Sequence, residues 1–129
     1  MNHLRIPASP TTPEVEFDFS AHSLAIKGES YPENASAFYQ PIIDATRAYL
    51  AECGGSAITV NISLGYFNSS STKLLFSFFE ALNNSAADGN HITLNWFYDE
   101  DDETILEFGE DIQEDFKSLD FRSQIIELG

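Results

Sequence analysis

The sequence predicts a two-layer α/β domain of order ββαβαβαβ, with a mixed β-sheet and helices mainly on one face. Segments that alternate apolar and polar residues take turns with segments of helical period, and strand–helix–strand units imply parallel pairing with right-handed crossovers. A short connection between the first two strands favours an antiparallel hairpin. The strand at 58–64 places Thr59, Asn61 and Ser63 between apolar residues, whereas a strand covered by helices on both sides would be apolar throughout. One sheet face is therefore predicted to meet solvent.

The N-terminal part is predicted to be an extended lead-in followed by a hairpin. Residues 1–13 contain three of the five prolines, which favours extended chain. Residues 15–19 and 23–27 alternate in hydrophobicity and are predicted to be the two hairpin strands.

The next segment, residues 28–34, breaks this pattern and leads into a helix. Its N-cap is either Ser30, which has capping-box spacing with Glu33, or Asn34. Pro41 lies inside the helical pattern and marks either a kink or a first turn. The apolar face of this helix comprises Phe38, Ile42, Ala45 and Tyr49. Two glycines at 54–55 are suited to ending it.

The remaining elements follow the same alternation. A strand at 58–64 leads to a helix that includes 74–82, and a strand at 91–98 leads to a helix that begins near 101–103. The apolar stripe of this last helix is Ile105, Phe108, Ile112 and Phe116. Residues 121–128 are predicted to be the final strand.

Composition indicates one globular domain spanning 1–129 and located in the cytoplasm. Hydrophobic residues make up 43% of the chain, which is enough for a packed core. No apolar run approaches the ~20 residues of a membrane span, the N-terminus has no signal-peptide pattern, and a single cysteine rules out an internal disulfide framework. The net charge of −15 argues against nucleic acid and membrane surfaces as partners. We expect the free protein to be a monomer.

The acidic charge is concentrated near the C-terminus. Residues 97–129 contain twelve acids and two bases, which forms either a solvated surface or a docking face for a basic partner. Asp99, Asp101 and Glu103 alternate as calcium ligands do, but the glycine and terminal glutamate of an EF-hand loop are missing. The histidines and the cysteine have no zinc spacing, and no catalytic motif is present. We therefore expect no metal, no cofactor and no enzymatic activity.

A cluster of hydroxyl groups lies between the strand at 58–64 and the helix at 74–82. Asn68, Ser69, Ser70, Ser71 and Thr72 fall where backbone N–H groups are free and the helix dipole is positive, so a phosphate would be well accommodated there. The same residues are also suited to be a plain helix cap, and one of Asn68, Ser69 and Ser70 is expected to serve as the N-cap.

Three stretches resemble one protein family. Residues 28–34 (Gly-Glu-Ser-Tyr-Pro-Glu-Asn) closely resemble the G-[DE]-S-Y-P-E-N signature of the SiaC family of bacterial regulatory phosphoproteins. Residues 66–71 (Tyr-Phe-Asn-Ser-Ser-Ser) resemble the family's Y-[LF]-N-[ST]-S-S segment, and residues 96–99 (Trp-Phe-Tyr-Asp) resemble its W-x-Y-D strand end. Their order and spacing match, so the resemblance covers roughly the whole chain.

The resemblance implies a STAS-like fold, similar to that of anti-sigma-factor antagonists, and a function as a phosphorylated switch. Family members are modified on the hydroxyl directly after the motif Asn, which implies Ser69, with Ser70, Ser71 and Thr72 as neighbouring alternatives. The implied partners are a serine/threonine kinase, a PP2C-type phosphatase and a diguanylate cyclase, which binds the unphosphorylated form in cyclic-di-GMP signalling. The partner-binding residues are expected to be Tyr31, Pro32, Glu33, Asn34, Asn68, Ser69 and Ser70.

Two other functions compete with the phospho-switch. The chain can be a constitutive STAS-like binding module in which Ser69 is only a helix cap. It can also be an enzyme or a metal-dependent regulator that uses the acids from Asp99 to Glu103.

Overall fold

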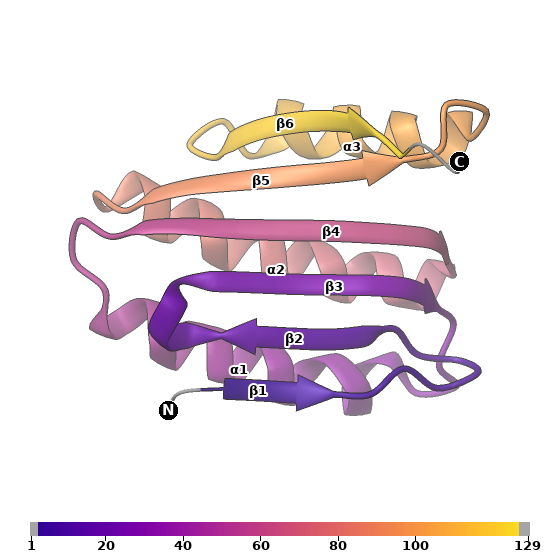
Figure 1. Ribbon diagram of the computed structural model, residues 1–129, viewed down its shortest axis with the longest axis horizontal. Helices are drawn as coiled ribbons and strands as arrows, with labels where there is room; N and C mark the ends of the chain where they lie inside the picture. Colours follow the sequence, from indigo (N-terminus) through magenta and orange to yellow (C-terminus); the bar gives the residue numbers. More distant parts are fainter. Residues whose placement is uncertain (1–2, 127–129) are drawn as a thin grey trace.

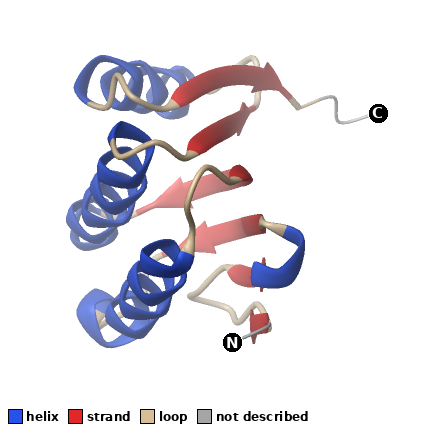
Figure 2. Ribbon diagram, turned by 90° about the vertical axis from the view of Figure 1, so that its left-hand side faces the viewer, coloured by secondary structure: helices blue, strands red, loops and turns tan. Residues whose placement is uncertain are grey.

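The computed structural model describes residues 3–126, which form one mixed β-sheet with three helices on one of its faces (Figures 1 and 2). The strands are β1 (His3–Ile6), β2 (Glu14–Asp18), β3 (Ser23–Ser30), β4 (Ala57–Phe67), β5 (His91–Tyr98) and β6 (Asp120–Ile125). The helices are α1 (Ala35–Glu52), α2 (Ser69–Ala87) and α3 (Glu103–Asp115). The predicted two-layer architecture is confirmed.

The strands lie across the sheet in chain order, β1 to β6. β1, β2 and β3 pair antiparallel, and β3 to β6 pair parallel, each parallel pair being joined through a helix. The hairpin of β2 and β3 turns through a short 3₁₀ segment, Phe19–Ala21, and His22 ends it in the left-handed region with φ 54°. The predicted hairpin and parallel units are both confirmed.

The structure corrects the predicted ends of several strands. The lead-in at 1–13 contains an additional edge strand, β1, so three strands precede α1 rather than two. β3 continues to Ser30 and β4 to Phe67, each three residues beyond the predicted end, because the two strands stay paired there. β6 ends at Ile125, and the predicted continuation to 128 reaches residues outside the described range.

The hydrophobic core fills the space between the sheet and the helices. Phe17 of β2 stacks on Phe78 of α2 with ring centroids 5.9 Å apart, and Trp96 of β5 stacks on Phe108 of α3 at 5.6 Å. Trp96 is 1% exposed, and its indole Nε1 donates a 2.9 Å hydrogen bond to the Ile105 carbonyl. This bond anchors the first turn of α3 to the sheet.

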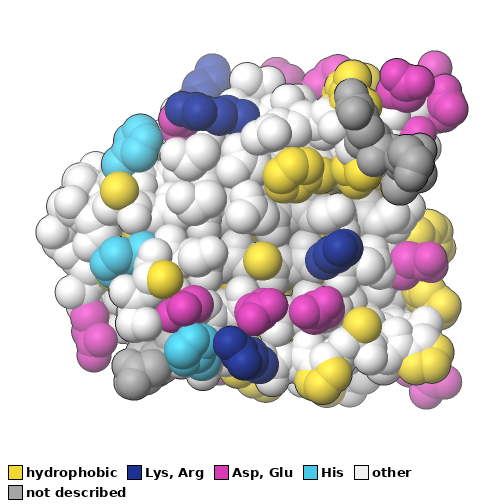
Figure 3. All heavy atoms as spheres, in the orientation of Figure 1, with side chains coloured by type: hydrophobic (Ala, Val, Ile, Leu, Met, Phe, Trp, Pro, Cys, Tyr) yellow, Lys and Arg dark blue, Asp and Glu magenta, His cyan; other side chains and the backbone are white. Residues whose placement is uncertain are grey.

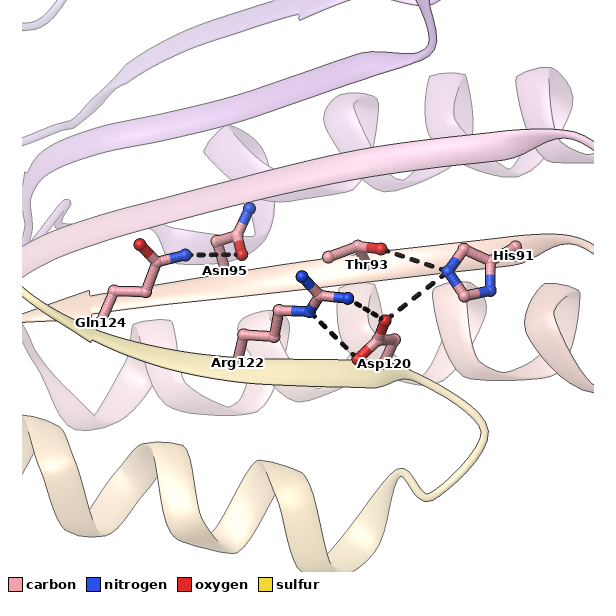
Figure 4. A network of polar contacts seen from close by, with 6 residues as sticks. All are labelled: His91, Thr93, Asn95, Asp120, Arg122 and Gln124. Carbon is pink, nitrogen blue, oxygen red and sulfur yellow. Dashed lines mark hydrogen bonds and ion pairs between the residues drawn. The ribbon is translucent and has the colours of Figure 1, made fainter.

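The opposite face of the sheet carries polar side chains on its parallel strands, some of which are drawn in Figure 4. Asn95 Nδ2 donates to Asn61 Oδ1 at 2.8 Å, and Gln124 Nε2 donates to Asn95 Oδ1 at 2.9 Å. Along β6, Arg122 makes two hydrogen bonds to Asp120, and these lower the pKa of that carboxyl. The predicted solvent-facing side of the sheet is therefore present.

A substitution at Gly109 tests the packing of α3 on the sheet, because a side chain there would collide with the core. A Cβ atom on Gly109 would lie 2.6 Å from both Cδ1 and Nε1 of Trp96. Replacing a helical glycine by alanine normally stabilises by about 1 kcal/mol, but overpacking of this kind costs about 1–3 kcal/mol. Gly109→Ala is expected to lower the free energy of unfolding in urea titrations. Gly54→Ala, just after α1, is the control for a glycine replacement without a clash, since a Cβ atom there meets nothing within 4 Å. An equal loss in both variants would contradict the prediction.

Candidate functional site

The two longest sequence motifs meet where β3 and β4 end. Their last paired residues are Glu29 with Tyr66 and Ser30 with Phe67. The backbone N–H of Asn68 then donates a 2.9 Å hydrogen bond to the Ser30 carbonyl. The segment that leads into α1 and the segment that leads into α2 therefore lie side by side, although they are almost forty residues apart in the chain.

Asparagines cap both helices. Asn34 Oδ1 accepts from the N–H of Ala37 at 3.1 Å, which decides the choice between Ser30 and Asn34 in favour of Asn34. Asn68 Oδ1 accepts from the N–H of Ser71 at 3.0 Å at the start of α2. Since Asn68 is the N-cap, Ser69 is the first residue inside the helix and is free of the capping role.

The structure separates the four candidate hydroxyls by accessibility. Ser69 and Ser70 are exposed, Thr72 is half-buried and Ser71 is fully buried. Ser70 Oγ donates to Asn68 Oδ1 at 3.2 Å, and Thr72 Oγ1 donates to the Asn68 carbonyl at 3.2 Å. Within residues 3–126, the Ser69 hydroxyl is the one member of the group that makes no side-chain hydrogen bond. Ser69 is therefore the hydroxyl that a modifying enzyme reaches with the fewest contacts to break.

Ser71 belongs to a buried hydroxyl cluster beneath the loop. Ser30 Oγ lies 2.6 Å from the Tyr39 hydroxyl and 2.9 Å from Ser71 Oγ, and Ser30 and Ser71 are both 0% exposed. The cluster joins the end of β3, the second turn of α1 and the first turn of α2. Because each hydroxyl has a partner, the cluster fixes the relative positions of the two helix N-termini without leaving a buried polar group unsatisfied.

The buried cluster should show in an alkaline titration. Burial raises the pKa of Tyr39 from its ordinary 10.0 to about 12. A raised folded-state pKa means that the neutral phenol favours folding, so this contribution is complete below about pH 10 and is lost as pH rises toward 12. The absorbance titration of the wild type minus that of Tyr39→Phe is expected to show a phenolate midpoint near pH 12, returning to about 10 in denaturant. A midpoint near 10 in the folded protein would contradict the burial of this group.

Two tyrosines form an exposed aromatic pair beside the loop. Tyr31 is 39% exposed and Tyr66 is 51% exposed, and their rings meet edge to face with centroids 5.8 Å apart. Pro32 is buried, whereas Glu33 is exposed. The pair and the exposed Ser69 and Ser70 all lie at or just after the carboxyl ends of β3 and β4, and we call these four residues the switch face.

Tyr66 is absent from the predicted partner-binding residues, and a β-bulge explains why. Ile62 and Leu64 are buried, so a strict alternation would bury Tyr66 as well. The register with β3 shifts at Gly65, since Gly28 pairs with Leu64 but Glu29 pairs with Tyr66. The extra residue turns Tyr66 outward, as bulges do. The sequence signal for this shift was the glycine, which often marks a bulge inside a strand pattern.

The third motif lies behind the switch face. Phe67 packs on Phe108 with centroids 4.5 Å apart and meets the edge of Trp96 at 6.5 Å. At the end of the motif, Asp99 Oδ1 accepts from the N–H of Asp101 at 2.9 Å. Thus Trp96 supports the β4 end from below, while Asp99 shapes the turn into α3.

Two kinds of site are not found in the part of the chain that the structure describes. Residues 3–126 hold no group of three or more His, Cys, Asp or Glu side chains placed to share a metal ion. Among the described helices, none combines the length and the apolar character that crossing a membrane requires.

Comparison with known proteins identifies relatives over nearly the whole length. The family model of the SiaC family regulatory phosphoproteins matches residues 6–126. An uncharacterised protein of Pseudomonas aeruginosa (strain UCBPP-PA14) is 32% identical over 115 residues, which cover 89% of this chain and 90% of that protein.

Solved structures agree with this. The structure of apo-SiaC from Pseudomonas aeruginosa superposes with a TM-score of 0.88 at 31% identity, covering 96% of this chain and 99% of that one. A second structure contains the diguanylate cyclase SiaD of Pseudomonas aeruginosa in complex with its activator SiaC. It matches with a TM-score of 0.88 at 32% identity, covering 95% of this chain and 99% of that one. The motifs, the fold and these matches agree: the chain belongs to the SiaC family of regulatory phosphoproteins.

Proposed function

We propose that this protein is a non-enzymatic switch, reversibly phosphorylated on Ser69, whose unphosphorylated form binds and activates a diguanylate cyclase. The observation that carries the proposal is the state of Ser69: exposed, free of side-chain hydrogen bonds, and placed one residue after the cap of α2 beside an exposed tyrosine pair. A related SiaC is the activator of the cyclase SiaD in a solved complex, which supports a cyclase as the partner.

The buried position of Ser71 supports Ser69 over its neighbours. A kinase active site must reach the hydroxyl that it phosphorylates, and Ser71 is fully buried with its hydroxyl bonded to Ser30. Thr72 is half-buried with its hydroxyl bonded to the Asn68 carbonyl. Ser70 is the nearest competitor, but its hydroxyl is bonded to Asn68 Oδ1.

The N-terminus of α2 lets the protein carry the modification without refolding. A phosphate adds about −1.5 to −2 charges and three acceptor oxygens. At the first helical residue it faces backbone N–H groups that have no intrahelical acceptor, together with the positive end of the helix dipole. The fold is retained while the charge of the switch face changes, so the modification acts on docking.

The enzymes that set the switch are a serine/threonine kinase and a PP2C-type phosphatase. The protein is their substrate and contributes no catalytic group of its own. Its role toward the cyclase is that of a binding surface, which fits the acidic cytoplasmic protein that the composition predicts.

The direct test is to incubate the protein with ATP and the serine/threonine kinase of its own genome that lies nearest its gene, and to localise phosphate by mass spectrometry. Phosphate is expected on Ser69, with no incorporation in Ser69→Ala and undiminished incorporation in the matched control Ser70→Ala. Phosphate that moves to Ser70, or that persists in Ser69→Ala, would exclude Ser69 as the acceptor.

A further inference from the structure

β4 runs past the end of β5 (Figure 1), and a cavity, which we call the notch, lies beside its last residues. Their pairing ends at Ile62 with Trp96, whereas β3 accompanies β4 as far as Phe67. Beyond Trp96, β5 pairs only with β6. Residues 63–65 of β4 line the resulting cavity, which has a volume of about 850 Å³. This size lies within the range of pockets that bind ligands.

The floor of the notch is an open strand edge. Within the described residues, the register of β4 with β5 ends at Ile62, so 63–65 have no partner strand on the side that β5 leaves. A Cβ atom on Gly65 would meet nothing within 4 Å, so the backbone is approachable. In a parallel ladder, N–H and C=O groups face the neighbouring strand at regular intervals, and an unpaired edge accepts a further strand. The notch thus has the backbone geometry for β-augmentation.

One wall of the notch is strongly acidic. The turn between β5 and α3 contributes Asp99 and Asp101, the first residue of α3 contributes Glu103, and acidic side chains gather at this end of the molecule (Figure 3). Asp102 and Glu29 also line the cavity, and Lys27 is its single basic residue among those described. Asp102 caps α3, and one carboxylate oxygen of Asp99 accepts from the N–H of Asp101. The second oxygen of Asp99 and the carboxylates of Asp101 and Glu103 are available to a cationic ligand.

The other wall is apolar. A second hollow of about 480 Å³ on the open sheet face shares Lys27, Ser63 and Ile126 with the notch. It is lined by Phe97 and by Ile125, which is 51% exposed. A strand lying in the notch would direct alternate side chains to this hollow and to the acidic turn.

We infer that the notch binds an extended segment of a partner protein in which apolar and basic residues alternate. The segment occupies the place that β5 leaves and pairs with the backbone of 63–65. Its apolar side chains contact Phe97 and Ile125, and its basic side chains contact Asp99, Asp101 and Glu103. The binding does not depend on the phosphorylation state of Ser69.

The probe is a hexapeptide of alternating valine and arginine, blocked at both ends, titrated into the full-length, unphosphorylated, ¹⁵N-labelled protein. Binding is expected to shift the backbone amide signals of 63–65 and to slow their hydrogen exchange. A peptide of the same composition with three valines followed by three arginines cannot divide its side chains between the two walls. It is expected to bind at least about tenfold more weakly.

Two triple variants distinguish binding to the acidic wall of the notch from nonspecific attraction of a basic peptide to an acidic protein. The first is Asp99→Asn, Asp101→Asn and Glu103→Gln, and it is expected to weaken the alternating peptide at least about tenfold. The matched control is Glu107→Gln, Glu110→Gln and Glu114→Gln, which removes the same charge from exposed positions of α3 and is expected to change affinity less than about threefold.

Equal affinity for the two peptides, equal losses in the two triple variants, or shifts confined to residues other than 63–65 would each overturn the inference. Neither a kinase nor a cyclase takes part in the titration. Its failure therefore leaves the phospho-switch intact, and failure of Ser69 phosphorylation leaves the notch intact.

Discussion

Phosphorylation of Ser69 is expected to weaken binding to the diguanylate cyclase more than a hundredfold, a loss of about 3 kcal/mol. We expect the interface that covers Ser69 to include the exposed Tyr31 and Tyr66 of the same switch face, so that the phosphate would be buried against an aromatic surface. Desolvating a group of two charges without a matching cation costs several kcal/mol. Calorimetric titration of the phosphorylated and unmodified proteins into SiaD of Pseudomonas aeruginosa, or into a cyclase of the same organism, measures the loss.

Three variants make this prediction specific to the position of the charge. Ser69→Asp adds one charge and is expected to weaken binding at least about tenfold. Ser69→Ala keeps the Asn68 cap and is expected to bind as the wild type does. Ser118→Asp adds the same charge at an exposed site before β6, at the opposite end of the parallel strands, and should leave binding unchanged. If Ser69→Asp bound like Ser118→Asp, the protein would be a constitutive binding module.

The layers and the strand pairing could be predicted because they depend on local periodicity. β5 and the apolar stripe of α3 follow directly from alternation and helical spacing in the sequence. β1 was missed because it is only four residues long and lies in a proline-rich stretch, and its strand character comes from pairing with β2. Short edge strands of this kind are defined by the neighbour, which the sequence pattern does not contain.

The site could be predicted only in part, for the same reason. Asn68, the cap, and the buried Ser71 both make hydrogen bonds to Ser30, which lies far away in the chain. Ser71 is buried because it meets Ser30, which is 41 positions earlier. A run of adjacent hydroxyls looks equivalent in sequence, whereas the fold gives each of them a different exposure and a different partner.

Tyr66→Ala is expected to weaken cyclase binding by about 2 kcal/mol, or about thirtyfold, while the fold remains intact. Tyrosines that are exposed in the free protein and central to a docking face are frequent hot spots, since they bury a large area at low entropic cost. Tyr66 is 51% exposed, and its ring meets the ring of the exposed Tyr31 edge to face. Thermal unfolding of Tyr66→Ala should therefore stay close to that of the wild type.

Phe67, the next residue, is the control position for Tyr66→Ala, because its replacement should reduce stability. Phe67 is half-buried against Trp96 and Phe108, so Phe67→Ala should lower the free energy of unfolding by about 3 kcal/mol. The bulge at Gly65 predicts this division, since it turns Tyr66 outward and Phe67 inward. If Tyr66→Ala lowered the free energy of unfolding and Phe67→Ala lost binding only because it unfolds, the bulge would not expose a docking residue. If Tyr66→Ala loses cyclase binding but keeps its stability, then the extra residue Gly65 places Tyr66 on the switch face at a position where a regular strand would bury it.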